Sequence, residues 1–196
     1  MTTPQGFAEN RTERLPKLAE GEMSDAQRAA AEAIVRGPRK AIFGPFIPLL
    51  HKPALMERLG DLGAVLRFES GLPERIRELV IAMTARATDN QFEWQTHAPL
   101  ALKAGVAQTT LDALAARRAP RDLPADEAAA LDVVAEILRH NGLSDASFME
   151  AERIFGCSGV VELTVLIGYF ATICWVMNIA RTPGPGTYPA LQATPA

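Results

Sequence analysis

The sequence predicts an all-α fold, and three observations support that prediction. Alanine and leucine dominate the chain of 196 residues, of which 48% are hydrophobic, and runs of β-branched residues are short. Apolar residues recur at helical spacing in several segments. Prolines and glycines separate these segments from one another. A chain of this length is expected to form one domain with a substantial core.

Charge and cysteine content argue against several classes of function. The net charge of -3 gives no electrostatic footprint for nucleic acid or for an anionic membrane surface. The two cysteines, Cys157 and Cys174, form neither a CxxC motif nor a zinc-ligand pattern. The N-terminus lacks the apolar stretch of a secretory signal, so a cytoplasmic location is expected.

We divide the chain into three parts by composition. Residues 1–22 are polar and rich in proline, glycine and charge, which predicts an arm with little structure of its own that packs on a neighbour. Residues 23–183 contain the periodic segments and form the predicted helical domain. Residues 184–196 are a Pro/Gly-rich tail with no core of its own.

The domain begins with a predicted helix over residues 25–35, which the N-cap signal of Ser24 precedes. The following segment, 37–52, holds three prolines and two glycines among apolar residues, so a regular helix is excluded there. An apolar loop of this kind is expected to cover a core or to line a pocket. His51 near its end is either a loop or cap residue or a contact to a substrate.

Two helices are predicted next, over residues 53–70 and 73–88. Pro53 opens the first and Pro73 starts the second. On the second helix, Glu78 lies off the apolar stripe, on the side of small residues that would allow another helix to approach closely. Glu78 is therefore either partly dehydrated in a helix seam, which raises the pKa of its carboxyl, or exposed and paired with Arg75.

The stretch from 89 to 106 predicts the central helix, with Asp89 as its N-cap. Its residues Glu93 and His97 are four apart, so they lie on one helix face within reach of each other. A carboxylate beside an imidazole can fix its tautomer and raise its basicity, although such pairs also occur on solvated faces. Pro99 collides with the carbonyl of Gln95, which predicts a kink or a local change of winding.

Four further segments complete the predicted domain. Helices are expected over residues 108–118, 124–140 and 144–155, with His140 as a capping residue in the last turn of the second. The segment 159–180 is apolar and about long enough to cross a bilayer. Glu162 and Asn178 interrupt it and no Lys/Arg cluster flanks it, which favours a buried core helix or one shared with a neighbouring subunit.

One long string resembles a known family. Residues 73–106, with the RxREL pattern at 75–79 and the FEWQTHAPLALKAGV block, are similar to the core motif of the carboxymuconolactone decarboxylase family. That superfamily also contains the alkylhydroperoxidase D proteins. The VELTVLIGYF segment and the later Asn178 agree with it. The resemblance covers roughly residues 40–183 and implies an all-helical subunit, assembled as a homotrimer or homohexamer with sites near subunit contacts.

The redox branch of this superfamily carries a CxxC motif with a histidine four residues after its second cysteine. Counting back from His97 places these two thiol positions at Asn90 and Glu93, so both cysteines are absent. A disulfide relay needs two thiols close enough to bond, and peroxidase activity of that kind is therefore disfavoured. The branch's proton-relay glutamate falls on Glu78. Retention of Glu78 and His97 with a glutamate at 93 is similar to the decarboxylase pattern.

The resemblance implies a cofactor-independent decarboxylation or proton transfer on a small lactone or keto acid from aromatic-compound breakdown. His97 would be the general acid/base, Glu93 would orient and polarise it, and Glu78 would relay protons. Trp94 would pack beside the pocket, with the loop 41–50 as a wall. The candidate substrate-binding residues are Trp94, Arg75, Arg86 and His51.

Two other functions stay open at this point. Glu93 and His97 suit zinc, iron or manganese, and a third ligand could come from Glu78, His51 or a neighbouring subunit. A helical oligomer that has lost its chemistry is the other alternative. The expected partners are a small-molecule substrate and further copies of this chain, with no nucleic acid, membrane, metal or organic cofactor.

Overall fold

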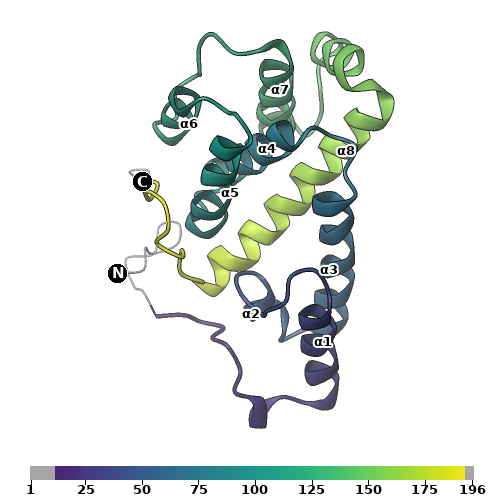
Figure 1. The fold of residues 1–196 in the computed structure, drawn as a ribbon, viewed down its shortest axis with the longest axis vertical. Helices are drawn as coiled ribbons and strands as arrows, with labels where there is room; N and C mark the ends of the chain where they lie inside the picture. The colour runs from purple at the N-terminus through teal and green to yellow at the C-terminus, as the bar shows by residue number, and fades with distance from the viewer. Residues whose placement is uncertain (1–11, 193–196) are drawn as a thin grey trace.

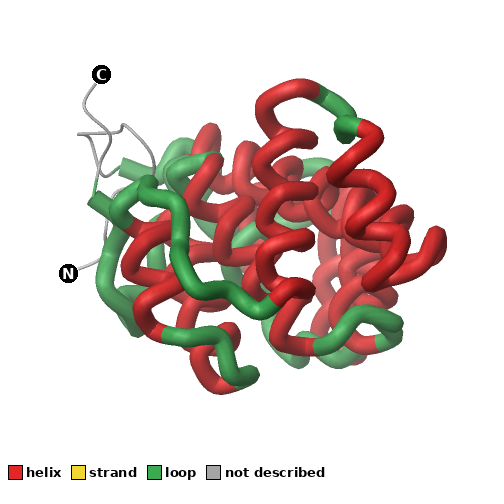
Figure 2. Tube along the Cα trace, turned by 90° about the horizontal axis from the view of Figure 1, so that it is seen from above, coloured by secondary structure: helices red, strands yellow, loops and turns green. Residues whose placement is uncertain are grey.

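The computed structural model describes residues 12–192, and within that range all regular structure is helical (Figure 2). The predicted all-α class is confirmed. The beginning of the predicted arm, to residue 11, and the end of the predicted tail, from residue 193, lie outside the described residues.

The helices follow the segments that periodicity and proline placement indicated. Their bounds are η1 (Glu20–Glu22, a 3-10 turn), α1 (Asp25–Arg36), α2 (Phe46–Leu49), α3 (Pro53–Phe68), α4 (Glu74–Ala87), α5 (Gln91–Lys103), α6 (Gln108–Ala115), α7 (Ala125–His140) and α8 (Asp145–Ala180). The short α2 lies inside the segment expected to be irregular, where Pro45 and Pro48 leave room for a single turn.

The long helix α8 is the centre of the fold. In Figure 1 it crosses the picture diagonally, with α4, α5 and α6 on one side of it and α1, α2 and α3 on the other. Gly156 has a non-helical backbone (φ 68°) inside α8, at the place where sequence analysis expected two helices to meet. Among the described residues, α8 is the one helix long and apolar enough to cross a membrane, and 56% of its most apolar stretch is buried inside the fold.

Helices α4 and α5 pack closely because small residues line the contact between them. Ala82, Ala85, Ala98 and Ala101 are fully buried in one core cluster, which also holds Trp94. The absence of bulky side chains lets the two helix backbones approach. Glu78 lies in this seam with 3% of its surface exposed, so of its two predicted environments the structure shows the dehydrated one.

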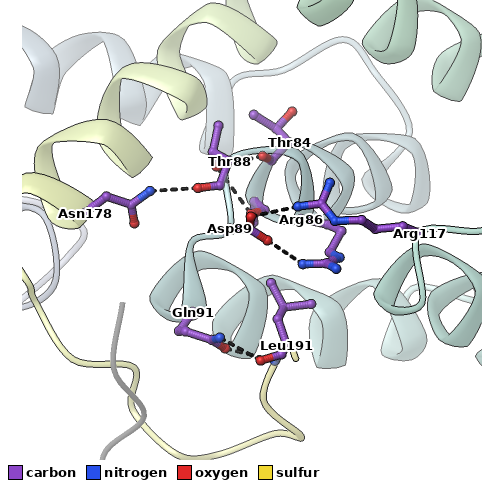
Figure 3. A network of polar contacts seen from close by, with 9 residues as sticks. Thr84, Arg86, Thr88, Asp89, Gln91, Arg117, Asn178 and Leu191 are labelled. Carbon is purple, nitrogen blue, oxygen red and sulfur yellow. Dashed lines mark hydrogen bonds and ion pairs between the residues drawn. The ribbon is translucent and has the colours of Figure 1, made fainter. Parts of the chain in front are cut away.

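The beginning of α5 differs from the predicted one by a single residue. Asn90 is the N-cap, and its side-chain oxygen accepts a hydrogen bond of 2.8 Å from the backbone N–H of Glu93. Asp89 has a left-handed backbone (φ 51°) and uses its carboxylate for ion pairs instead. Asn90 also donates to Asn178 on α8. Asn178 in turn donates to the carbonyl of Thr88 (Figure 3), so the α4–α5 turn is fixed against the central helix.

The Pro/Gly-rich tail packs on the core of the helical domain. Gln91 exchanges two hydrogen bonds with the backbone of Leu191, and the buried Leu191 side chain joins the α4–α5 cluster (Figure 3). The helix α5 continues through Pro99 with no change of winding. The carbonyl of Gln95, which Pro99 leaves without its helical donor, accepts a hydrogen bond of 3.2 Å from the hydroxyl of Thr187.

Candidate active site

A buried histidine lies between two carboxylates in the seam of α4 and α5. His97 Nδ1 is 2.5 Å from Glu78 Oε2, and His97 Nε2 is 3.0 Å from Glu93 Oε2. The three side chains are at most 5% exposed. Both ring nitrogens therefore have an acceptor, and the imidazole can donate two hydrogen bonds only when it is protonated.

Helix geometry explains how this cluster forms. Glu93 and His97 are one turn apart on α5, which brings the carboxylate to Nε2 of the ring. Glu78 reaches Nδ1 from the neighbouring helix α4. Because Asn90 caps α5 and Asn178 holds the preceding turn, the rotation of α5 about its axis is fixed, and with it the direction of His97.

Pairing outweighs burial in setting the protonation of His97 and Glu78. Burial lowers the pKa of His97, but the hydrogen bonds to Glu78 and Glu93 together raise it by more than burial lowers it. The net pKa therefore lies above its ordinary value of 6.5. Burial raises the pKa of Glu78, but the hydrogen bond from His97 lowers it, and the net pKa lies below 4.5. The raised pKa expected for a dehydrated Glu78 is thus wrong, because the imidazolium compensates for the lost water.

Glu93 and His97 line a cavity of about 30 Å³, whereas Glu78 lies behind them and does not line it. Its interior is formed by buried side chains that include Phe46, Tyr169 and Phe170. Its outer lining is more exposed and consists of Arg39, Phe43, Arg67, Phe92 and Thr96. The loop before α2 thus supplies a wall, in the place where sequence analysis expected the segment 41–50.

Two arginines at this cavity have no carboxylate partner among residues 12–192. Arg39 donates to the carbonyl of Gly60 at 3.1 Å, bonds the Tyr169 hydroxyl and lies over the Phe46 ring. Arg67 lies over the ring of Phe68. Burial raises the pKa of Tyr169 to about 12, so its phenol stays protonated at neutral pH. The cavity thus combines two cations and a hydroxyl donor with the acidic cluster at its inner end.

A glycine on α3 makes room for this arrangement. A Cβ built on Gly63 would lie 2.1 Å from the Tyr169 hydroxyl and 2.6 Å from Arg39 Nη2, distances that no real contact shows. The close approach of α3 to both side chains therefore requires glycine at this position.

The four predicted substrate-binding residues do not line this cavity. Arg75 is paired with Asp126 and Glu127 of α7, and Arg86 is paired with Asp89. Trp94 points toward the tail, where its indole N–H donates to the carbonyl of Pro189 at 3.0 Å. The exposed His51 lies in the turn between α2 and α3.

The residues that sequence analysis missed at the cavity are Arg39, Arg67 and Tyr169. Arg39 lies in an irregular loop, Arg67 in the last turn of α3, and Tyr169 more than 70 residues after His97. No local spacing connects these positions with one another. The proline- and glycine-rich composition of 37–52 was a signal for a pocket wall, but it did not single out the arginine within that wall.

A metal site at Glu93 and His97 lacks geometric support in the described part of the chain. Within residues 12–192, no group of three or more His, Cys, Asp or Glu side chains is arranged to hold a metal ion. Both nitrogens of His97 face carboxylates at hydrogen-bond distance, so neither lone pair is directed at an open coordination position.

The buried pair predicts a characteristic pH dependence of stability. A raised folded-state pKa means that His97 contributes stability below pH 6.5 and loses it as pH rises through that raised value. A lowered folded-state pKa means that Glu78 contributes stability above pH 4.5 and loses it as pH falls through that lowered value. We expect the stability difference between wild type and His97→Gln, measured by urea unfolding, to be largest between pH 4.5 and 6.5. A stability difference between the two proteins that stays constant from about pH 3 to about pH 9, the range in which these groups titrate, contradicts the pairing.

Comparison with known proteins agrees with this geometry. The sequence model of the Carboxymuconolactone decarboxylase family matches residues 53–136, which include Glu78, Glu93 and His97. A similar solved structure is described as an alkylhydroperoxidase AhpD core, an uncharacterized peroxidase-related protein from Ralstonia eutropha JMP134. It has a TM-score of 0.71 and 17% sequence identity, over 92% of this chain and 96% of that chain. This similarity establishes a shared fold. The comparison with curated proteins gave no match.

Proposed function

We propose that this chain, whose residues 53–136 match the model of the carboxymuconolactone decarboxylase family, is a cofactor-independent acid–base enzyme acting on a small organic acid. The reaction is a decarboxylation or a related proton transfer on a lactone or keto acid. The observation that supports this proposal most directly is His97, buried with one carboxylate at each ring nitrogen, beside a cavity. Proton transfer needs a positioned group of this kind.

The geometry suggests a role for each member of the cluster. Glu93 and His97 line the cavity, so this pair exchanges the proton with the substrate. His97 carries the proton, and Glu93 orients the imidazole ring. Glu78 is held behind the ring, where it stabilises the imidazolium and relays the proton. In a decarboxylation the C–CO2 bond breaks, CO2 leaves, and the electron pair of that bond moves into the conjugated carbonyl system. The proton held by Glu93 and His97 is then transferred to the carbon atom.

The outer part of the cavity favours an anionic substrate. Arg39 and Arg67 have no carboxylate partner in the described chain, and guanidinium groups bind carboxylates through paired hydrogen bonds. Phenylalanine rings flank them and suit a flat, unsaturated body. Because the cavity of about 30 Å³ has room for little more than one water, a substrate enters by displacing side chains at its outer lining.

A peroxidase that works through a dithiol is less well supported. Cys157 is exposed and Cys174 is buried on the same helix, and 17 residues of helix separate them by roughly 25 Å. The two positions that carry thiols in the redox branch hold the helix cap Asn90 and the cavity residue Glu93. A disulfide cannot form in either arrangement.

Replacement of the central histidine tests the proposed function. We expect His97→Gln to lower turnover by about 100-fold or more, because a positioned proton-transfer group is lost. Turnover is measured by release of CO2 or by proton–deuterium exchange, with a panel of small lactone acids, β-keto acids and hydroperoxides. His140→Gln, at an exposed helix end far from the cavity in sequence, is the matched control and keeps wild-type turnover.

Each outcome of this panel has a defined meaning. Turnover of acids but not of their methyl esters supports the role of the two arginines. A folded His97→Gln variant with near-normal turnover refutes the acid–base assignment. Turnover of hydroperoxides in preference to acids contradicts the proposal. Inactivity of wild type toward the whole panel supports the non-catalytic oligomer.

We also propose that the chain assembles into a homo-oligomer, a trimer or hexamer, through an apolar stripe on α8. Val161, Val165, Trp175 and Ile179 are 40–64% exposed and recur at helical spacing, so they form one face of the central helix. Large exposed apolar side chains in a contiguous row are typical of subunit contacts.

Charge placed on this stripe tests the assembly. We expect the double variant Trp175→Lys/Ile179→Lys to sediment as a smaller species than wild type, because two desolvated cations oppose association. Met149→Lys, at an equally exposed apolar position before Gly156, is the control and keeps the wild-type mass. A monomeric wild type, or a double variant with unchanged mass, contradicts the proposal.

A further inference from the structure

A second cavity, separate from the candidate active site, lies between α4, α6, α7 and the loop that joins α6 to α7. Its volume is about 700 Å³, within the range of small-molecule sites. It shares no lining residue with the cavity at Glu93 and His97. We call it the arginine groove, because Arg86, Arg117, Arg118 and Arg139 all line it.

The wall of the arginine groove is apolar. Met83 comes from α4, Leu114 from α6, Leu123 from the connecting loop, and Leu131 and Ala135 from α7. These side chains form a surface that is large enough for a ring system or a short aliphatic chain. Burial of such a body would remove apolar surface from water on both sides of the contact.

The charges around this wall are unbalanced. Asp89 pairs with both Arg86 and Arg117 (Figure 3). Asp132 is the one acidic residue among the described residues of the lining, and burial together with Glu136 raises the pKa of its carboxyl. Within residues 12–192, Arg118 and Arg139 have no carboxylate partner, so they add two further positive charges to the lining.

Arg86 shows the effect of this imbalance. It is 6% exposed, and its Nε–H has no hydrogen-bond acceptor in the described chain. Burial lowers the pKa of Arg86, and the charge of Arg117 lowers it further, against the opposing effect of Asp89. An anion bound near these guanidinium groups would reduce their mutual repulsion, and this reduction is a source of binding free energy.

We propose that the arginine groove binds a small organic carboxylate, with its apolar body on the α4–α7 wall and its carboxylate among the guanidinium groups of Arg118, Arg139 and Arg86. The volume, the apolar wall and the excess of positive charge agree on a ligand with both properties. The proposal does not depend on the proposed function of the other cavity, because the two sites share no residue.

The probe for this site is 2-naphthoate, with 2-naphthamide as its uncharged counterpart, titrated against the full chain by calorimetry. We expect 2-naphthoate to bind with one site per chain. We expect Arg118→Gln/Arg139→Gln to weaken that binding by about 10-fold or more, since charge-assisted hydrogen bonds are lost. Ala135→Trp, at an exposed position of α7, fills the groove and should abolish binding without disturbing the core.

Two control variants distinguish binding in the arginine groove from binding at the protein surface or in the active-site cavity. Arg121→Gln changes an exposed arginine of the same loop that does not line the groove, and it should leave the affinity unchanged. Arg39→Gln/Arg67→Gln changes the other cavity and should also leave it unchanged. The proposal is overturned if wild type does not bind 2-naphthoate, if 2-naphthamide binds equally well, or if the two groove variants bind like wild type. Loss of binding in Arg39→Gln/Arg67→Gln alone also overturns it, because the ligand then occupies the active-site cavity.

Discussion

The hydrogen bond between His97 and Glu78 is the interaction on which the rest of this structure depends. It joins α4 to α5 inside the fold, where a charged group without a partner would cost several kcal/mol, on the order of what a whole domain has in reserve. The pair is tolerated because each side chain satisfies the other and Glu93 satisfies the remaining ring nitrogen. The alanines of the seam are part of the same constraint, since bulkier residues would hold the helices too far apart.

Elements distant in sequence restrict α5 to the position that this interaction requires. Asn178 of the central helix binds the turn before α5, Asn90 caps the helix, and the tail binds Gln91 and Gln95 along its outer side. The side of α5 that carries Glu93 and His97 thus faces the cavity, while hydrogen bonds from the side chains of Gln91 and Gln95 to the backbone of the tail hold its other side. The hydroxyl of Thr187 donates a hydrogen bond to the carbonyl of Gln95, which lacks a helical donor because of Pro99.

The sequence was informative where a property depends on neighbours along one helix, and less so where it depends on contacts between segments. Helical periodicity located the main helices, and the spacing of Glu93 and His97 indicated their contact. The family resemblance added Glu78 to this pair, which spacing alone could not do. Asn90 and Asp89 are both good caps, and the choice between them was decided by Asn178, which is 88 residues away from Asn90.

The arginines show most clearly which properties could not be predicted from the sequence. Arg75 and Arg86 were candidates for the active-site cavity, yet Arg75 pairs with Asp126 and Glu127 of α7, and Arg86 pairs with the nearby Asp89 and lines the arginine groove instead. Arg39 and Arg67 lie at the cavity because a loop and the end of α3 meet there, and Gly63 permits the approach. Such a meeting of segments is a property of the packed chain and leaves no pattern in the local sequence.

The most direct test of this account is the protonation of His97, observed through the ¹⁵N resonances of its imidazole ring. The account predicts a doubly protonated ring in wild type at pH 6.5, the ordinary pKa of histidine, and a titration that moves to lower pH in Glu78→Gln. A wild-type ring that is already neutral at that pH, or a titration that Glu78→Gln does not change, would contradict the claim that a buried imidazolium–carboxylate pair organises this site.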